Sequence, residues 1–365
     1  MSLLQEGHRI GDTYEVERFL GEGAFAEVYR VKHRFLGRQA MKVFKAPGMT
    51  QEEIVTSLGE AVLLSRLGHP NIIRVFDASV LEARGGKYGY FTMEYVAGGS
   101  LDQFWRSFGP RFMPVATVIE LTRQICRGLA IAHAEKPPIV HRDIKPQNVL
   151  VGYEADGLRV RISDFGLAKR ANPLTLLVSA KGTLCFKAPE AFEDYKSDSC
   201  AGDVWAVGTT MYLLLTDRFP FAMPETGDID PRCFQQAPIP PSRLNALVDT
   251  ALDQLVLRCV QTNPKQRYPD ATAVLSEVER WAAGTHDRPV TKPTSADTSK
   301  AALGAHSPAN EELARAKAKA AFKLARETGR LNEAADLLEE ALNKSPSVRS
   351  EYESQVKLWR RGILM

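Results

Sequence analysis

The hydrophobic pattern of this chain changes its period once, from that of strands to that of helices. Three strands are expected over residues 14–20, 27–32 and 39–44, a helix over 51–67, and two more strands over 72–78 and 88–95. From residue 115 onward the spacing of apolar residues is helical, with runs at 115–135, 203–216, 244–261 and 270–283. The pattern therefore predicts an α+β protein in which a small strand-rich part precedes a larger helix-rich part.

Composition excludes several classes of protein. The chain is 44% hydrophobic and 25% charged, which is ordinary for a globular protein and excludes a disordered or fibrous one. Its net charge of +3 is too balanced for a protein that grips nucleic acid by its phosphates, so we expect no nucleic-acid partner. The most apolar stretch, 204–215, is shorter than the ~20 residues that span a bilayer. We expect no membrane span.

The N-terminus and the cysteines both predict a cytoplasmic protein. Residues 1–12 contain no apolar segment of the kind found in secretory signal peptides. The five cysteines are odd in number and no pair is spaced as Cys-x-x-Cys. Free thiols in a reducing compartment are the expected state.

The composition changes again after Ala283. Residues 284–310 hold three prolines, many Ser and Thr and few aliphatics, which predicts a flexible linker. Residues 311–365 are helical, and Gly329, Ala334 and Pro346 fall where a tetratricopeptide helix-turn-helix unit places such residues. An ordinary helical hairpin is the alternative. Its apolar face needs a cover, which the last helix, the preceding domain, a second copy or a partner protein could supply.

Two features of the strand-rich part suit a phosphate group. Gly21 and Gly23 lie between two strands, where missing side chains let backbone N–H groups approach a phosphate, although such a turn can also be a simple hairpin. Lys42 stands in an apolar strand, where a cation needs an anionic partner unless it faces solvent. Glu60 on the following helix is the expected carboxylate, with Glu53 as the alternative.

The stretch from His141 to Asn148 carries the densest chemistry in the chain. Asp143 can orient a hydroxyl group and accept its proton, and Lys145 can neutralise a phosphoryl group during transfer. Asn148 can bind a hard cation through its amide oxygen, and Asp164, which follows a predicted strand at 159–162, can bind it through its carboxylate. Apolar residues on both sides predict that this stretch is an anchored loop.

Taken in order, these motifs over residues 12–283 resemble those of the eukaryotic-type (Hanks-type) Ser/Thr protein kinases, and of the bacterial members in particular. The resemblance implies a bilobal fold with a small β-rich N-lobe and a larger helical C-lobe. It implies domains at 12–283 (kinase), 284–310 (linker) and 311–365 (a TPR-like all-α module). It also implies that Lys42, held by Glu60, binds the α- and β-phosphates of ATP, and that Asp143 is the catalytic base. Lys145 then contacts the γ-phosphate, and Asn148 and Asp164 bind Mg²⁺, with Mn²⁺ as the alternative metal.

The resemblance also implies a set of nucleotide contacts. Ala26 replaces the family's third glycine, and Met93 is the residue beside the adenine pocket. The expected nucleotide-binding residues are Leu20, Gly21, Gly23, Val28, Ala40, Lys42, Met93, Glu94, Val96 and Leu150.

The activation segment of the family ends at Ala188-Pro189-Glu190 here, with Arg267 placed as the partner of that glutamate. Asp203 matches the residue that ties down the catalytic loop. Arg142 matches an arginine that often pairs with a phosphate on the activation segment. Thr175 and Ser179 are the candidate autophosphorylation sites, and Thr183 is expected to dock the substrate.

The predicted reaction is phosphoryl transfer from ATP to Ser or Thr hydroxyls of protein substrates. Three alternatives remain: a pseudokinase that binds partners without turnover, a small-molecule phosphotransferase of related fold, and an adaptor whose tail is its main function. The tail is expected to bind a protein partner, to self-associate or to regulate.

Overall fold

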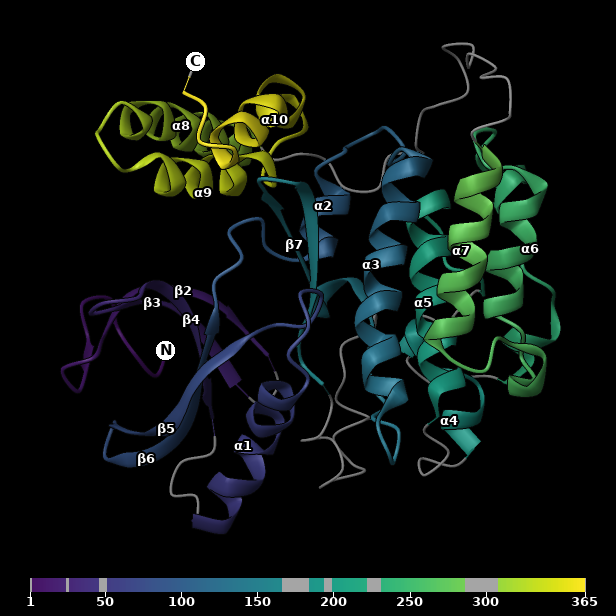
Figure 1. Ribbon diagram of the computed structural model, residues 1–365, viewed down its shortest axis with the longest axis horizontal. Coiled ribbons are helices and arrows are strands. Elements are labelled where there is room, and N and C mark those ends of the chain that lie inside the picture. Colours follow the sequence, from purple (N-terminus) through teal and green to yellow (C-terminus); the bar gives the residue numbers. More distant parts are fainter. Residues whose placement is uncertain are drawn as a thin grey trace. The chain divides into compact units, whose positions relative to one another are not determined.

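The computed structural model describes residues 2–23, 26–45, 51–165, 184–193, 199–221, 231–285 and 308–364. The side chains of residues 51–57, 60, 193, 231, 232 and 285 lie outside this description. The chain divides into two compact units. The first contains the residues up to Tyr95 together with Asp164 and Phe165, and the second contains Val96–Ser163 and the described residues from Leu184 onward. Figure 1 shows the elements of both.

A six-stranded antiparallel sheet forms the first unit, with the order β1-β2-β3-β4-β6-β5. Its strands and helix are β1 (Arg9–Ile10), β2 (Tyr14–Glu22), β3 (Ala26–His33), β4 (Gly37–Phe44), α1 (Gln51–Arg66), β5 (Val75–Ala83) and β6 (Gly86–Glu94). The first three predicted strands and the helix are confirmed. The prediction for β5 was wrong at its start, because Ile72 donates its N–H to His69 O in a turn and the ladder begins only at Val75, opposite Met93.

One face of this sheet is covered by the N-terminal segment, which sequence patterns missed. Leu4 is buried, and its N–H donates to the hydroxyl of Tyr29 at 2.9 Å. Glu27, also buried, accepts hydrogen bonds from that hydroxyl and from Leu3 N. The strand β1 is only two residues long, too short to show a period in the sequence.

Helices dominate the second unit. They are α2 (Leu101–Arg106), α3 (Val115–Ala134), α4 (Glu190–Glu193), α5 (Cys200–Thr216), α6 (Thr250–Cys259) and α7 (Ala271–Thr285). Helix α5 is buried along nearly its whole length and packs against α3, α6 and α7. A Cβ on Gly208 would lie 2.3 Å from Cys259 Cβ, so the glycine permits the close approach of α5 and α6.

Two of the predicted helices of this unit had the wrong bounds. The run predicted at 244–261 begins only at Thr250, because Asp249 caps the helix by accepting the N–H of Leu252 at 2.8 Å. Helix α5 begins three residues earlier than predicted, after the N-cap Ser199. All five cysteines are free thiols, and burial raises the pKa of Cys259 to about 12.

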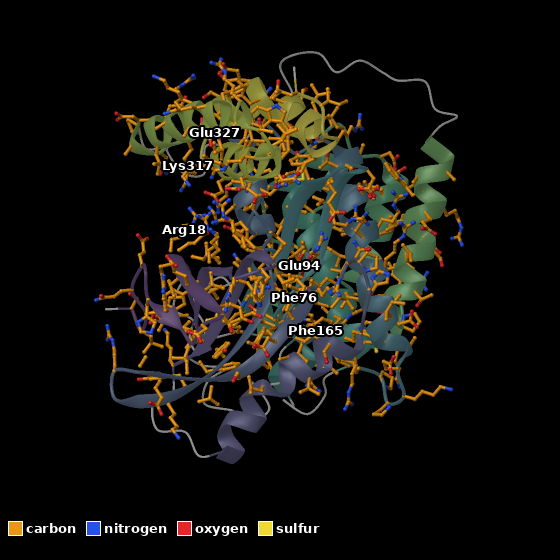
Figure 2. All side chains as sticks on the ribbon, turned by 60° about the vertical axis from the view of Figure 1, so that its left-hand side comes forward. Arg18, Phe76, Glu94, Phe165, Lys317 and Glu327 are labelled. Atoms are coloured by element: carbon orange, nitrogen blue, oxygen red, sulfur yellow. The ribbon has the colours of Figure 1, made fainter. Side chains whose placement is uncertain are left out.

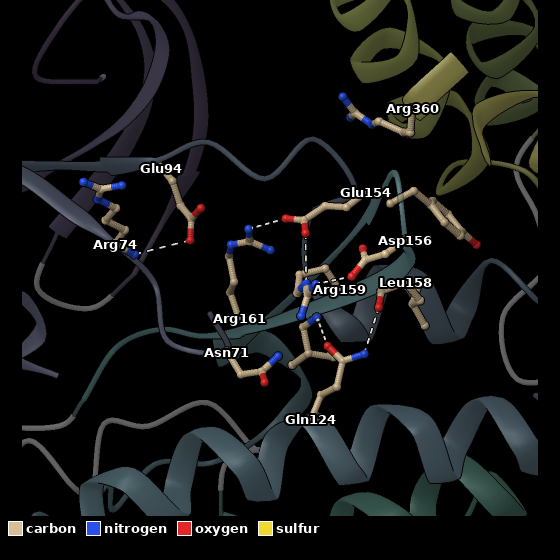
Figure 3. A network of polar contacts seen from close by, with 12 residues as sticks. Asn71, Arg74, Glu94, Gln124, Glu154, Asp156, Leu158, Arg159, Arg161 and Arg360 are labelled. Atoms are coloured by element: carbon tan, nitrogen blue, oxygen red, sulfur yellow. Dashed lines mark hydrogen bonds and ion pairs between the residues drawn. The ribbon is translucent and has the colours of Figure 1, made fainter. Parts of the chain in front are cut away.

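A two-stranded hairpin, β7 (Val149–Glu154) and β8 (Gly157–Ile162), lies against α3. The side chain of Gln124 on α3 donates to Leu158 O and accepts from Val160 N, both at 2.8 Å (Figure 3). Burial alone would raise the pKa of Glu154, but ion pairs with Arg159 and Arg161 lower it. Figure 3 shows both guanidinium groups pointing at this carboxylate. Hydrogen bonds of the Gln124 side chain therefore hold the hairpin on α3, and ion pairs stabilise the hairpin internally.

Three helices follow in the tail: α8 (Pro308–Ala325), α9 (Leu331–Leu342) and α10 (Pro346–Arg360). Gly329 has a φ of +77°, which suits the turn between α8 and α9. Phe322 of α8 packs edge-on against Trp359 of α10, with ring centroids 5.0 Å apart. Lys317, labelled in Figure 2, forms an ion pair with Glu340 of α9 at 2.6 Å. Pro346 is the first residue of α10 and follows the N-cap Ser345.

The tail's helices begin at Pro308, three residues before the predicted start of the tail at residue 311. Helix α10 covers part of the apolar face of α8 and α9, which is one of the covers that the sequence left open. The likeness to a tetratricopeptide unit stays a prediction. In the described part of the chain, no helix is both long enough and apolar enough to cross a membrane.

Candidate active site

In the first unit, Lys42 on β4 contacts Asp164. Its Nζ lies 2.7 Å from Asp164 Oδ1, and the lysine side chain is only 13% exposed. The ammonium also lies 5.6 Å from the centroid of the Phe91 ring. Asp164 has a φ of +61°, which is uncommon for residues other than glycine. In this conformation its carboxylate contacts Lys42. The predicted phosphate-binding lysine and a predicted metal ligand are thus neighbours. Glu60 lies on α1, with its side chain outside the described residues.

The strands of the same unit align several predicted nucleotide contacts. Val28 pairs with Lys42 across β3 and β4, and Ala40 pairs with Met93 across β4 and β6. Ala40 and Met93 are both buried. Because paired residues of neighbouring strands project to the same face of a sheet, these four side chains lie on one face.

The glycine turn between β2 and β3 is described on both sides of residues 24 and 25. The register between these strands shifts between Phe19 and Gly21, and Gly23 N donates to Ala26 O at 2.8 Å. Among the described residues, no atom outside Gly21 and its chain neighbours lies within 4 Å of a Cβ placed on Gly21. Leu20, the first predicted contact, is 36% exposed.

The remaining predicted nucleotide contacts are divided between the two units along the sequence. Glu94 ends β6, where its N–H donates to Arg74 O at 2.9 Å. Val96 belongs to the second unit, as does Leu150 on β7, which forms an isolated bridge with Ser100.

The predicted catalytic loop of the second unit brings Lys145 and Asn148 to the carboxylate of Asp143. Asp143 is buried, and its Oδ2 lies 3.0 Å from Lys145 Nζ. The amide nitrogen of Asn148 donates both to that oxygen and to the backbone oxygen of Asp143, each at 2.8 Å. Two donated bonds fix the orientation of the amide, so the carbonyl oxygen of Asn148 points away from Asp143.

Asp203 anchors this loop. Its carboxylate accepts the backbone N–H of His141 at 2.7 Å and that of Arg142 at 2.8 Å, and it accepts a third bond from His133 Nε2 at 3.0 Å. Burial alone would raise the pKa of Asp203, but the hydrogen bond from His133 and the nearby histidines lower it. A buried carboxylate with three donors is stable as the anion. It therefore holds the backbone just before Asp143.

Two histidines that support the loop have defined tautomers. His133 Nδ1 accepts the N–H of Ala271, so its Nε2 carries the proton that is donated to Asp203. His141 Nδ1 accepts the N–H of Asp143, so its Nε2 donates to Ser163 O at 3.0 Å. The role of His133 was missed at the sequence level, because nothing in its helical run distinguishes it from a core histidine.

Arg142 lines a small surface hollow. Its φ is +71°, and its backbone oxygen accepts a bond from Lys187 Nζ at 2.7 Å. The hollow is lined by Arg142, Lys187 and Glu190, together with apolar residues such as Phe186. Two carboxylates, Glu190 and Asp203, also line this hollow, so its charges are balanced. The candidate hydroxyls Thr175, Ser179 and Thr183 lie outside the described residues.

The predicted pair of Arg267 and Glu190 is present. Two nitrogens of the guanidinium contact the two carboxylate oxygens, each at 2.7 Å, and Arg267 is buried. The same guanidinium donates to the backbone oxygens of Ala201 and Gln261 and lies 4.9 Å from the Trp205 ring. This geometry is fixed and fully bonded, which suits a structural support for the end of the activation segment.

Comparison with known proteins gives consistent results. Residues 14–278 match the family model described as the protein kinase domain. The chain is 32% identical over 276 residues to a probable serine/threonine-protein kinase of Clostridium acetobutylicum, covering 74% of this chain and 40% of the relative. It is 29% identical over 277 residues to the serine/threonine-protein kinase PknB of Mycobacterium tuberculosis, covering 74% of this chain and 43% of the relative. The chain thus spans less than half the length of these curated relatives.

Among solved structures, the chain is similar to the kinase domain of Mycobacterium tuberculosis PknI. The TM-score is 0.56 and the identity is 26%, with 77% of this chain and 100% of that chain covered.

Proposed function

Because this chain belongs to the protein kinase family, we propose that it transfers the γ-phosphoryl group of ATP to Ser or Thr hydroxyls of proteins. The observation that carries the proposal is the cluster in the catalytic loop, where Lys145 and Asn148 both contact the carboxylate of Asp143. A general base that deprotonates a hydroxyl group needs an ionised carboxylate in a fixed position. A cation beside it can neutralise the charge of the phosphoryl group during transfer.

In the proposed reaction, the protein supplies position and charge rather than covalent chemistry. Asp143 orients the acceptor hydroxyl and takes its proton as the Ser or Thr oxygen attacks the γ-phosphorus. The bond between that phosphorus and the oxygen that bridges it to the β-phosphate breaks, and ADP leaves. Lys145 offsets the charge that builds on the phosphoryl oxygens. Lys42 binds the α- and β-phosphates, which replace or share its contact with Asp164.

The proposed metal ligands fit Mg²⁺, and Mn²⁺ is the alternative. Magnesium prefers oxygen donors and is usually bound by one or two carboxylates together with substrate phosphates and water. Asn148 offers a carbonyl oxygen because its amide nitrogen is engaged by Asp143, and Asp164 offers a carboxylate. When bound, the metal neutralises charge on the phosphates of ATP.

We extend the proposal to substrate docking and control. Thr183 is proposed to contact the substrate, and Thr175 or Ser179 to be autophosphorylated. The support for a phosphorylated segment is the resemblance at Arg142, which matches an arginine that often pairs with a phosphate on this segment. Proteins that carry Ser or Thr are the proposed substrates, and the tail is proposed to regulate or to bind a protein.

Phosphoryl transfer to protein tests the proposed function. The full chain is incubated with γ-labelled ATP, Mg²⁺ and a general protein substrate, followed by phosphoamino-acid analysis. We expect phosphoserine and phosphothreonine from the wild type and a loss of about 10²–10⁴-fold in Asp143→Ala. Asp156→Ala is the matched control, because Asp156 is 65% exposed on the β7–β8 turn and pairs with Arg159.

The result also separates the alternatives. No consumption of ATP by the wild type would indicate a pseudokinase, and consumption without labelled protein would indicate a small-molecule phosphotransferase. Equal labelling by Asp143→Ala would contradict the assignment of the base.

A further inference from the structure

Arg349 of α10 is a buried cation that joins the tail to the rest of the second unit. It is 4% exposed, and its guanidinium donates to Ser107 Oγ at 2.6 Å and to Tyr153 Oη at 3.3 Å. The same group donates to Asn343 Oδ1 at 2.6 Å and lies 4.4 Å from the centroid of the Phe104 ring. Breaking only some of these contacts would leave a buried charge without its partners, which is energetically unfavourable. We therefore expect the contacts of Arg349 to form and break together.

Two further tail residues reach the segment that follows Val96. Asn343 Nδ2 donates to the backbone oxygen of Gly98. Glu339 is 1% exposed, and its Oε1 accepts the N–H of Tyr153 at 3.3 Å and a bond from Arg360 at 2.8 Å.

Glycines make this approach possible. A Cβ on Gly98 would lie 3.1 Å from Glu339 Oε2 and 2.1 Å from Val151 O. A Cβ on Gly152 would lie 3.4 Å from the same carboxylate oxygen. Side chains at these positions would push the tail away or displace β7, so both glycines shape the docking surface.

The backbone that the tail contacts also carries predicted adenine contacts. Gly99 N donates to Val96 O at 3.1 Å, and Gly99 O accepts the N–H of Val151 at 2.9 Å. Leu150 is adjacent to Val151 and bridges to Ser100. Val96 is two residues before Gly98, which Asn343 contacts, and Leu150 is three residues before Tyr153, which Glu339 contacts.

We propose that docking of α9 and α10 on Gly98, Gly99, Ser107 and Tyr153 positions the nucleotide site, and that Arg349 is the positioning residue that secures it. The proposal rests on the proposed function for the roles of Val96 and Leu150. Gly99 has a φ of +68°, and paired glycines order poorly unless neighbouring groups fix them. The docked tail fixes them by bonding to Gly98 O and to the strand beside Gly99. Undocking then weakens nucleotide binding.

Nucleotide affinity in the full chain tests this inference. Binding of MgADP is measured by calorimetry for the wild type, Arg349→Met and Arg349→Glu. A coupling between sites typically changes affinity fivefold or more, so we expect a fall of at least about fivefold in both variants. Arg315→Met is the matched control, because Arg315 pairs with Glu311 and Glu351 inside the tail, and it should bind as the wild type does.

Amide hydrogen exchange shows whether the tail has undocked. Residues 96–107 and 149–155 should lose protection in Arg349→Glu, because a carboxylate beside the Phe104 ring removes all three donated bonds. Unchanged exchange in this variant would overturn the role of Arg349. Faster exchange with unchanged affinity, or tighter binding, would overturn the coupling. If Arg349→Glu does not fold, Arg349→Met carries both measurements.

Kinetics separates positioning from general damage. The loss should appear in KM for ATP rather than in kcat, because Arg349 acts on binding groups and not on Asp143. A fall in kcat with unchanged KM would contradict the inference. Failure of the wild type to bind MgADP would instead contradict the proposed function, so the two failures are distinguishable.

Discussion

Two buried carboxylates in the second unit, Asp203 and Glu339, have opposite surroundings. Each is 1% exposed. Asp203 accepts bonds from His133 and from two backbone N–H groups, and its pKa is lowered. Glu339 uses Oε1 alone, its Oε2 has no partner among the described residues, and burial raises its pKa to about 7 despite Arg360.

The difference indicates that Asp203 is a support whose charge is constant near neutral pH, whereas the contact made by Glu339 depends on pH. The anion of Asp203 is preferred in the folded state and holds the catalytic loop at any pH near neutral. The carboxyl of Glu339 changes charge near pH 7, in the middle of the surface between the tail and Gly98. We therefore expect a change of pH near neutral to leave the catalytic loop unchanged and to alter the stability of the tail contact.

The largest expected effect follows from Asp203→Asn. An amide can accept only through one oxygen, so it cannot satisfy the three donors, and removing one partner of a buried charged network costs about 3–5 kcal/mol. We expect a loss of that size in the free energy of unfolding, measured by denaturant titration, together with a loss of phosphoryl transfer. A variant as stable as the wild type would remove the distinction drawn between the two carboxylates.

The pH dependence of stability has opposite signs at the two sites. The pKa of Glu339 is raised from 4.5 to about 7, so its contribution is full below pH 4.5 and is lost as the pH rises through about 7. The pKa of Asp203 is lowered from 3.8, so its contribution is present above that value and is lost only in stronger acid.

Glu339→Gln sharpens this contrast. A neutral amide keeps an acceptor for Tyr153 N but does not titrate. The free energy of unfolding of the variant should therefore lose a pH-dependent contribution of the order of 1–3 kcal/mol. The melting temperature of the variant should then vary less than that of the wild type between pH 5 and pH 8. Parallel curves for the two proteins would show that Glu339 does not titrate in this range.

Tyr153→Phe should have a smaller effect. The hydroxyl bonds to Glu353 at 2.7 Å and accepts from Arg349, and loss of one such bond costs about 1 kcal/mol. Faster amide exchange of α10, with no change at His141 to Asn148, is the expected result. An equal change in both places would mean that the two regions are not energetically separate.

The smallest effect is expected from Arg106→Ala. Arg106 is 62% exposed and pairs with Asp102 one turn earlier on α2, and exposed pairs of this kind contribute less than about 0.5 kcal/mol. A larger loss of stability would show that this exposed pair contributes as much as a buried contact.

Local patterns predicted much of the site. The strands around Lys42 and the loop from His141 to Asn148 are contiguous motifs, so their elements could be predicted from spacing alone. The pair of Arg267 and Glu190 was expected from the family resemblance and is confirmed by the structure. The contact of Lys42 with Asp164 was not predicted, because 122 residues separate them.

The docking of the tail could not be predicted for a related reason. Arg349 is one basic residue among many on a charged helix, and its partners lie 242 and 196 residues away. The only signal is that Val348, Val356 and Trp359 form a buried stripe, which indicates that α10 has an apolar face but not what covers it. Short elements such as β1 carry no period at all.

A double-mutant cycle on kcat/KM for ATP most directly tests the central claim that residues far apart in the sequence act on one nucleotide. The variants are Lys42→Met, Asp143→Asn and the pair. Groups that act as a unit are strongly non-additive, so we predict a loss of about 10²–10⁴-fold in each single variant and little further loss in the double variant. Independent, multiplicative losses, or wild-type turnover in either single variant, would contradict the account.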